Sequence, residues 1–173
     1  MDTDIDREWV SSELEKGLAA ERTLAAEARE RAKSPPDPTF TVVYSELTVA
    51  EDRHRLILET IAIRYGHTPT PKGGGGGIGG TVHWLRGKVT DIGSSPLDRL
   101  TYDLVARASS VLWYTAWVHA FQSIGDAESA RELAAILTEK KAHCEALQGG
   151  LNRLVEARVK PADAAVPAAS EAI

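Results

Sequence analysis

Five residues of types that bind metals or form ion pairs stand near the middle of the helices that this sequence predicts. They are Glu21, the pair Glu51-x-x-His54 and the pair Lys140-x-x-His143. Residues three apart on a helix lie on the same side, so each pair presents two polar side chains to one neighbour. Carboxylates and imidazoles together bind Zn, Mn or Fe, whereas carboxylates beside an ammonium form ion pairs. The sequence therefore predicts a polar centre that holds either a metal ion or an ion-pair network.

Four helical segments are predicted to position these residues. They span residues 6–33, 38–65, 96–124 and 126–158. Each begins after a residue whose side chain can cap a helix, and the turns after the second and third contain a glycine. The capping residues are Asp6, Asp37, Ser95 and Asp126, and the glycines are Gly66 and Gly125. The many Ala, Leu, Glu and Arg residues favour helix over sheet.

Apolar residues at spacings of three and four mark a buried face on each segment, and Glu21, His54 and Lys140 lie on these faces. The residues expected in the core are Leu14, Leu47, Ile57, Leu104, Val111, Leu137 and Leu147. The pair Gly149-Gly150 is expected to kink or break the last segment.

Residues 67–94 contain five consecutive glycines at 73–77 and predict a long crossover, within which residues 81–92 fit a short helix. A helix of this size is about 40 Å long. If the second and third helices run parallel, the connection must return that distance, which nearly thirty residues do easily. Short loops on either side of it predict two helical hairpins.

The 173 residues fit one domain, residues 1–157, followed by an Ala- and Pro-rich tail at 158–173 that we expect to be disordered. A formal net charge of -5 gives no footprint for nucleic-acid binding. The chain has one cysteine, Cys144, and neither a signal-like start nor an apolar run of about 18 residues. We therefore expect a cytoplasmic protein with no internal disulfide and no membrane partner.

From residue 6 to about residue 156, the sequence resembles the ferritin-like superfamily, especially its small bacterial stress-associated members. The motifs that carry the resemblance are Glu-Asp-Arg-His at 51–54, before an aliphatic run, and Ser-Ile-Gly-Asp-Ala-Glu-Ser-Ala-Arg at 123–131. The resemblance implies an all-α four-helix bundle with a long crossover between the second and third helices. It also implies a non-haem di-iron site for oxygen activation or iron oxidation, with ligands at Glu21, Glu51, His54 and His143.

The sequence departs from the family pattern on two helices. Between Leu100 and Gly125 the carboxylate nearest the middle is Asp103, almost two turns away, and Lys140 stands where the family has Glu. Two carboxylates and one ammonium carry too little negative charge to hold two divalent ions. We therefore expect a degenerate centre with two alternatives. Either Lys140 pairs with the two glutamates, or one Fe, Mn or Zn binds the four ligand residues and Lys140 stays outside.

The expected function is that of a ferritin-like protein that binds one metal at most, in stress response or metal handling. The alternative is a non-catalytic structural or protein-interaction bundle, and any enzymatic role would be that of a metal-dependent oxidoreductase. On the third helix, Trp113, Trp117 and Phe121 cover more than one face. This surface predicts either cover by the crossover around Trp84 or a homodimer interface.

Overall fold

The computed structural model describes residues 3–67 and 95–159 of the chain. These ranges form four α-helices, α1 (Thr3–Lys33), α2 (Thr41–Arg64), α4 (Pro96–Ser123) and α5 (Ala127–Val159), with a short 3-10 helix η1 (Pro38–Phe40) before α2. No strand occurs in them. The prediction of an all-α helical bundle is confirmed, and the helices begin and end within three residues of the predicted bounds.

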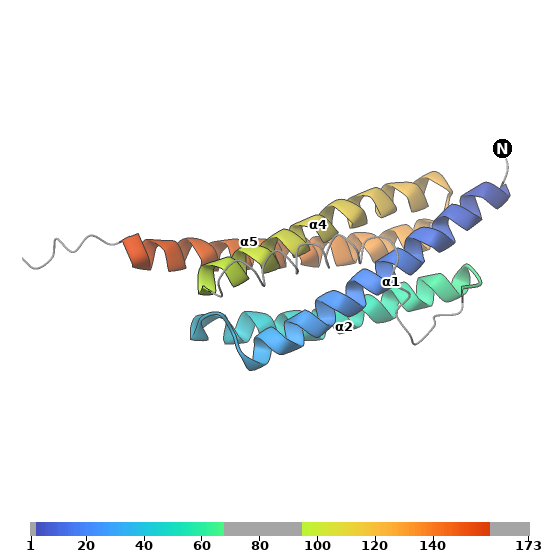
Figure 1. The fold of residues 1–173 in the computed structure, drawn as a ribbon. Helices are drawn as coiled ribbons and strands as arrows, with labels where there is room; N and C mark the ends of the chain where they lie inside the picture. Colours follow the sequence, from blue (N-terminus) through green and yellow to red (C-terminus); the bar gives the residue numbers. More distant parts are fainter. Residues whose placement is uncertain (1–2, 68–94, 160–173) are drawn as a thin grey trace, which may run out of the picture.

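The helices form two antiparallel hairpins, α1 with α2 and α4 with α5, which lie against each other along their length (Figure 1). α2 and α4 run in the same direction, because Tyr44 contacts Asp103 while Glu51, two turns later, contacts Arg107. The end of α2 and the start of α4 therefore lie at opposite ends of the bundle, as a crossover requires.

Two parts of the sequence prediction lie outside the described residues. Residues 68–94 hold the glycine run, the expected short helix and Trp84, and residues 160–173 hold most of the expected tail. At the other predicted turns, Gly66 and Gly125 have φ angles of 78° and 83°, the left-handed conformation that glycine adopts most readily.

Each helix buries one stripe of residues spaced three and four apart, except that Lys140 and Leu147 on α5 are seven apart. On α1 these are Val10, Leu14, Gly17, Glu21, Leu24 and Ala28; on α2 Tyr44, Leu47, Glu51, His54, Leu58 and Ile61; on α4 Leu100, Asp103, Arg107, Ser110, Tyr114, Trp117 and Phe121; and on α5 Ser129, Leu133, Ile136, Lys140, Leu147 and Gly150. This spacing is typical of helices that pack at small crossing angles. The polar residues of the stripes separate two apolar clusters.

The core prediction is partly wrong. Leu14, Leu47 and Leu147 are buried, but Ile57, Leu104, Val111 and Leu137 are half-buried at the edges of the stripes. On α2 and α5, neighbouring residues one position away, Leu58 and Ile136, point directly inward instead. At both positions the sequence has two adjacent apolar residues, Ile57-Leu58 and Ile136-Leu137. The rotation of the helix about its axis determines which of the two is buried.

The aromatic residues of α4 that were considered for a homodimer interface lie mostly inside the bundle. Trp117 and Phe121 are buried in the apolar core, and Trp113 is half-buried against it. The indole of Trp117 fits over Gly17 of α1, where an added Cβ would lie 2.5 Å from the ring. A glycine on the facing helix thus lets a large aromatic side chain enter the core.

The pair Gly149-Gly150 does not break α5, which continues to Val159. Gly150 is buried against the ring of Phe40, and a Cβ added there would lie 2.1 Å from Cε1 of that ring. Gly149 has room for a Cβ, which would lie 3.6 Å from the side chain of Arg153, an ordinary van der Waals contact.

We expect the substitution Gly150→Ala to destabilise the fold by about 1–3 kcal/mol, because the methyl group overpacks against Phe40. The matched variant Gly149→Ala should be neutral or stabilise by up to about 1 kcal/mol, since alanine is the better helix former. Urea unfolding followed by circular dichroism measures both. Equal effects at the two positions would contradict the close contact at Phe40.

Asp126 caps α5, as predicted, by accepting hydrogen bonds from the backbone N–H (3.0 Å) and hydroxyl (2.6 Å) of Ser129. The hydroxyl of Tyr65 donates a third, at 2.9 Å. Partial burial opposes the shift, but the bonds from Ser129 and Tyr65 lower the pKa of Asp126 below its ordinary value.

We expect Asp126→Ala to destabilise the fold by about 1–2 kcal/mol at pH 7. A depressed carboxyl pKa gives stability that is present above the unfolded pKa of about 4 and is lost as the pH falls through the folded value. The difference between variant and parent should therefore shrink in thermal melts below about pH 4. A difference that stays constant from pH 7 to pH 3 would contradict an ionised cap.

Candidate functional site

The ammonium of Lys140 lies in the middle of the bundle, between the carboxylates of Glu21 and Glu51. Its Nζ is 2.9 Å from Oε1 and 3.2 Å from Oε2 of Glu21, and 2.8 Å from Oε2 of Glu51. The side chain is 1% exposed, and both glutamates are buried. A single ammonium group therefore contacts a carboxyl group of α1 and one of α2 at the same time.

Tyr114 of α4 completes the contacts around Glu21 and Lys140. Its hydroxyl donates to Oε1 of Glu21 at 3.1 Å, and the Lys140 ammonium lies 5.2 Å from the centre of its ring. A cation at this distance from an aromatic face is attracted by the ring quadrupole. Burial raises the pKa of Tyr114 well above its ordinary value, so the hydroxyl stays a donor.

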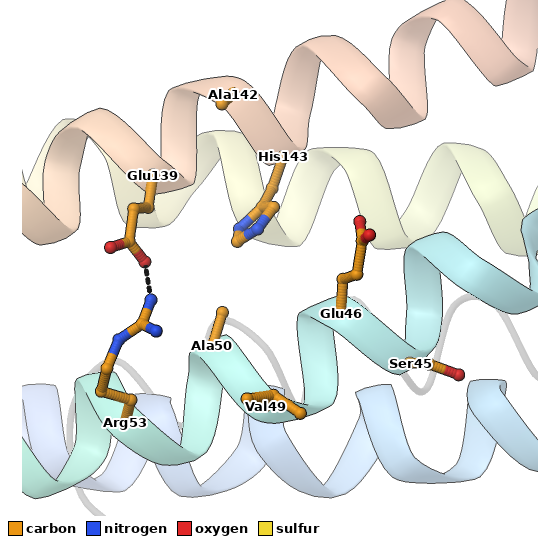
Figure 2. A pocket seen from close by; sticks show the side chains of 8 residues that line it. All are labelled: Ser45, Glu46, Val49, Ala50, Arg53, Glu139, Ala142 and His143. Atoms are coloured by element: carbon orange, nitrogen blue, oxygen red, sulfur yellow. Dashed lines mark hydrogen bonds and ion pairs between the residues drawn. The ribbon is translucent and has the colours of Figure 1, made fainter.

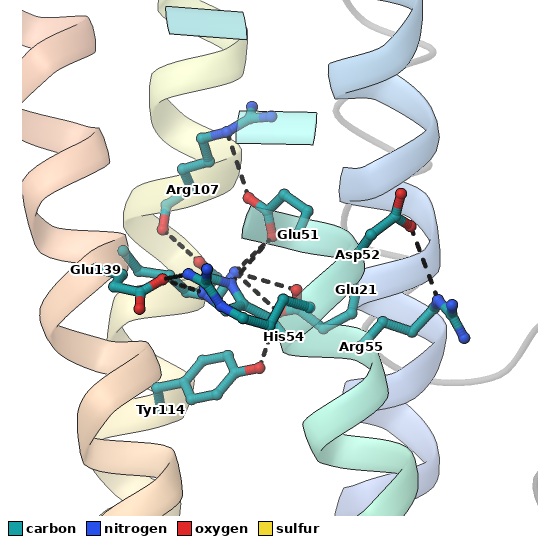
Figure 3. A network of polar contacts seen from close by, with 11 residues as sticks. Glu21, Glu51, Asp52, His54, Arg55, Arg107, Tyr114 and Glu139 are labelled. Atoms are coloured by element: carbon teal, nitrogen blue, oxygen red, sulfur yellow. Dashed lines mark hydrogen bonds and ion pairs between the residues drawn. The ribbon is translucent and has the colours of Figure 1, made fainter. Parts of the chain in front are cut away.

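Arg107 and Asp103 of α4 extend the polar centre toward one end of the bundle. Nε of Arg107 is 3.7 Å from Oε1 of Glu51 (Figure 3), and Arg107 is as deeply buried as its partner. Asp103 accepts from Nε of Arg31 at 2.9 Å and from the hydroxyl of Tyr44. α1, α2 and α4 therefore each contribute a fully buried carboxyl group, and α4 also contributes a guanidinium.

The two central glutamates differ in protonation. Burial raises the pKa of Glu21 to about 8, against the attraction of Lys140, and the neighbouring carboxylate of Glu51 adds to the rise. Burial also acts on Glu51, but contact with Lys140 holds its pKa well below the ordinary value. Burial alone would lower the pKa of Lys140, yet the two glutamates raise it. These shifts favour the neutral form of Glu21 and the ionised form of Glu51.

His54 connects this centre to the surface (Figure 3). Its Nδ1 is 3.7 Å from Oε2 of Glu51, and its Nε2 is 2.9 Å from Oε2 of Glu139, on the outer side of α5. Glu139 also pairs with Arg53. The imidazole is fully buried. It lies between the buried carboxylate of Glu51 and the partly exposed pair of Glu139 with Arg53.

His143 is not brought into the same set of ligand atoms. Its ring centre lies 6.5 Å from that of His54, and its Nδ1 has no hydrogen-bond partner within the described ranges. The side chain is half-buried, and burial lowers its pKa. It instead faces an open groove of about 570 Å³ between α2 and α5 (Figure 2). The lining residues are Ser45, Glu46, Val49, Ala50, Arg53, Glu139, Ala142 and His143.

Among the described residues, Glu21, Glu51 and His54 form the group that could hold a metal, with ligand atoms within 4.8 Å of one another. Two carboxylates and an imidazole are suitable donors for Zn, Mn or Fe. The ammonium of Lys140 contacts both carboxylates, so a metal at this place requires Lys140 to move away. The metal role of these three residues and of His143 stays a prediction.

Arg107 was not predicted as part of the site, and Asp103 was predicted to lie too far from the middle of the third helix to join it. In the structure, both side chains are buried. The sequence does indicate that they face inward, because Tyr114, Trp117 and Phe121 are spaced three and four apart. The same spacing, continued toward the N-terminus of the helix, reaches Ser110, Arg107, Asp103 and Leu100, all of which are buried.

Cys144 does not join the centre. Its side chain is half-buried, and burial raises the pKa of its thiol. In the described part of the chain, no helix combines the length and apolar character needed to cross a bilayer.

Neither the models of known protein families nor the curated proteins match this sequence. The site is therefore interpreted from its own geometry.

We expect Lys140→Met to destabilise the fold by about 3–5 kcal/mol, because it leaves the buried Glu51 carboxylate without its closest cation. Adding Glu51→Gln should recover part of that loss, since the uncompensated charge is removed with little change in volume. Denaturant unfolding of the two single variants and the double variant measures the coupling. Additive losses would show that the two side chains do not stabilise each other.

Proposed function

We propose that the chain is a ferritin-like four-helix bundle whose centre is closed by an internal ammonium, and that it serves as a non-catalytic structural or protein-binding bundle. The observation that carries this proposal is the position of Lys140 Nζ, within 3 Å of both Glu21 and Glu51. The parallel course of α2 and α4 supports the ferritin-like topology, in which one long crossover separates two hairpins.

Charge supports an ammonium-closed centre. Three cations, Arg31, Arg107 and Lys140, pair with the three buried carboxyl groups of this layer, which belong to Asp103, Glu51 and Glu21. A divalent ion between the glutamates would face Lys140 at short range, and an ammonium displaced without a partner in the interior costs several kcal/mol. The centre therefore favours its own cation over an added one.

A second candidate is a site for one Fe, Mn or Zn formed by Glu21, Glu51 and His54. The closeness of their ligand atoms, within 4.8 Å, favours it. This candidate goes with a role in metal handling or stress response, and with oxidoreductase activity if the metal is redox-active. It needs a conformation in which Lys140 leaves the two glutamates.

Metal content separates the two candidates. In protein purified from its native host, elemental analysis should find far less than one equivalent of Fe, Mn or Zn per chain. One equivalent that survives dialysis, and is lost in Glu51→Gln, would overturn the ammonium-closed centre and support the second candidate.

Lys140→Glu should destabilise the metal-free protein, because it adds a buried carboxylate and removes the cation. It should also add a third carboxylate beside Glu21, Glu51 and His54, so Fe(II), Mn(II) or Zn(II) should bind there and raise its melting temperature. The control is Lys141→Glu on the exposed side of α5, which should do neither. If the two variants melt alike with and without metal, position 140 is not the centre of the site.

A further inference from the structure

α2 carries a second apolar stripe, on its outer side. Val42, Val49, Leu56 and Ile63 are 66%, 67%, 53% and 62% exposed. They stand seven residues apart, so they form one nearly straight stripe about 32 Å long, with a drift of only about 20° per step. A helix that is apolar on two sides needs cover on both. Within the described ranges, nothing covers this outer stripe.

We propose that two copies of the chain associate through this stripe, with their α2 helices side by side and parallel. A seven-residue repeat is the period at which two helices stay in contact along their length. A second copy presents the same repeat over the same length, so each apolar residue meets its own counterpart across a two-fold axis. The proposal gives a partner to the protein-binding role proposed above, and rests on it to that extent.

The charges beside the stripe agree with the parallel arrangement. Asp52 lies on the side of α1, where it pairs with Arg29, and Arg53 lies on the side of α5, where it pairs with Glu139. A two-fold axis parallel to the helices brings Arg53 of each copy beside Asp52 of the other. An antiparallel pair would instead place like charges together, Arg53 with Arg53 and Asp52 with Asp52, which is unfavourable.

The other described helices offer no comparable surface. On α4, Val105 and Leu112 are 42% and 71% exposed and also stand seven apart, but the next position is His119. That stripe therefore has half the apolar residues of the one on α2. It provides the matched control, since Leu112 is as exposed as any residue of the α2 stripe.

Light scattering after gel filtration, over a range of concentrations, tests the association with the full chain. We expect a dimer. Val49→Glu with Leu56→Glu should raise its dissociation constant at least about a hundredfold, since every lost contact counts in both copies. Leu112→Glu should leave the dimer unchanged. Circular dichroism and melting of the three proteins should show that the exposed substitutions keep the bundle folded.

Oxidative cross-linking tests the orientation in a Cys144→Ser background. Val49→Cys alone should form a disulfide-linked dimer, as should Leu56→Cys alone. Linkage only in a mixture of the two variants would overturn the parallel arrangement. A monomer at all concentrations, or a dimer lost in Leu112→Glu but kept in the α2 variants, would overturn the proposal and leave the stripe to another part of this chain or to a different protein.

The two proposals fail separately. The α2 variants leave Lys140 and its glutamates intact, and the metal measurements do not depend on mass. A metal-free monomer would retain the ammonium-closed centre and remove only the named partner. A dimer that holds one equivalent of metal would support the association through α2 and overturn the ammonium-closed centre.

Discussion

The contacts of Lys140 with Glu21 and Glu51 join the two halves of the bundle. The first hairpin, α1 with α2, supplies both carboxylates, and the second, α4 with α5, supplies the buried cations Lys140 and Arg107. These groups contact one another only when the two hairpins are packed together in one relative position. The polar centre therefore fixes the position of one hairpin along the other. Apolar clusters on both sides supply most of the burial, and they tolerate more than one register.

The protonation of Glu21 follows from the same constraint. Glu21 is fully buried, and an ionised carboxyl in the interior is costly because burial removes it from water. Taking up a proton at Glu21, whose pKa is raised to about 8, removes that charge without removing the side chain. The hydroxyl of Tyr114 and the ammonium of Lys140 still bind the neutral carboxyl.

Local chemistry made the helices and part of the site predictable. Asp126 and Ser95 cap the starts of α5 and α4 as predicted, whereas α1 begins at Thr3, before the predicted cap Asp6. Spacing alone placed Glu21, Glu51 and Lys140 on inward faces. Helix rotation was harder, because adjacent apolar residues such as Ile57 and Leu58 satisfy the same pattern. The aromatic residues of α4 were misplaced for a related reason, since the sequence of one helix does not show that Gly17 on another makes room for Trp117.

The outer apolar stripe of α2 can be recognised only when the buried stripe of that helix has been identified. Both stripes repeat at seven residues, so the sequence alone shows a helix that is apolar on several sides and does not say which side faces the bundle. The buried contacts of Glu51 and His54 settle that orientation, and they turn Val49 and Leu56 outward. The polar centre therefore sets the direction in which α2 presents its remaining apolar surface, and a change at Lys140 that rotated α2 would alter the outer stripe as well.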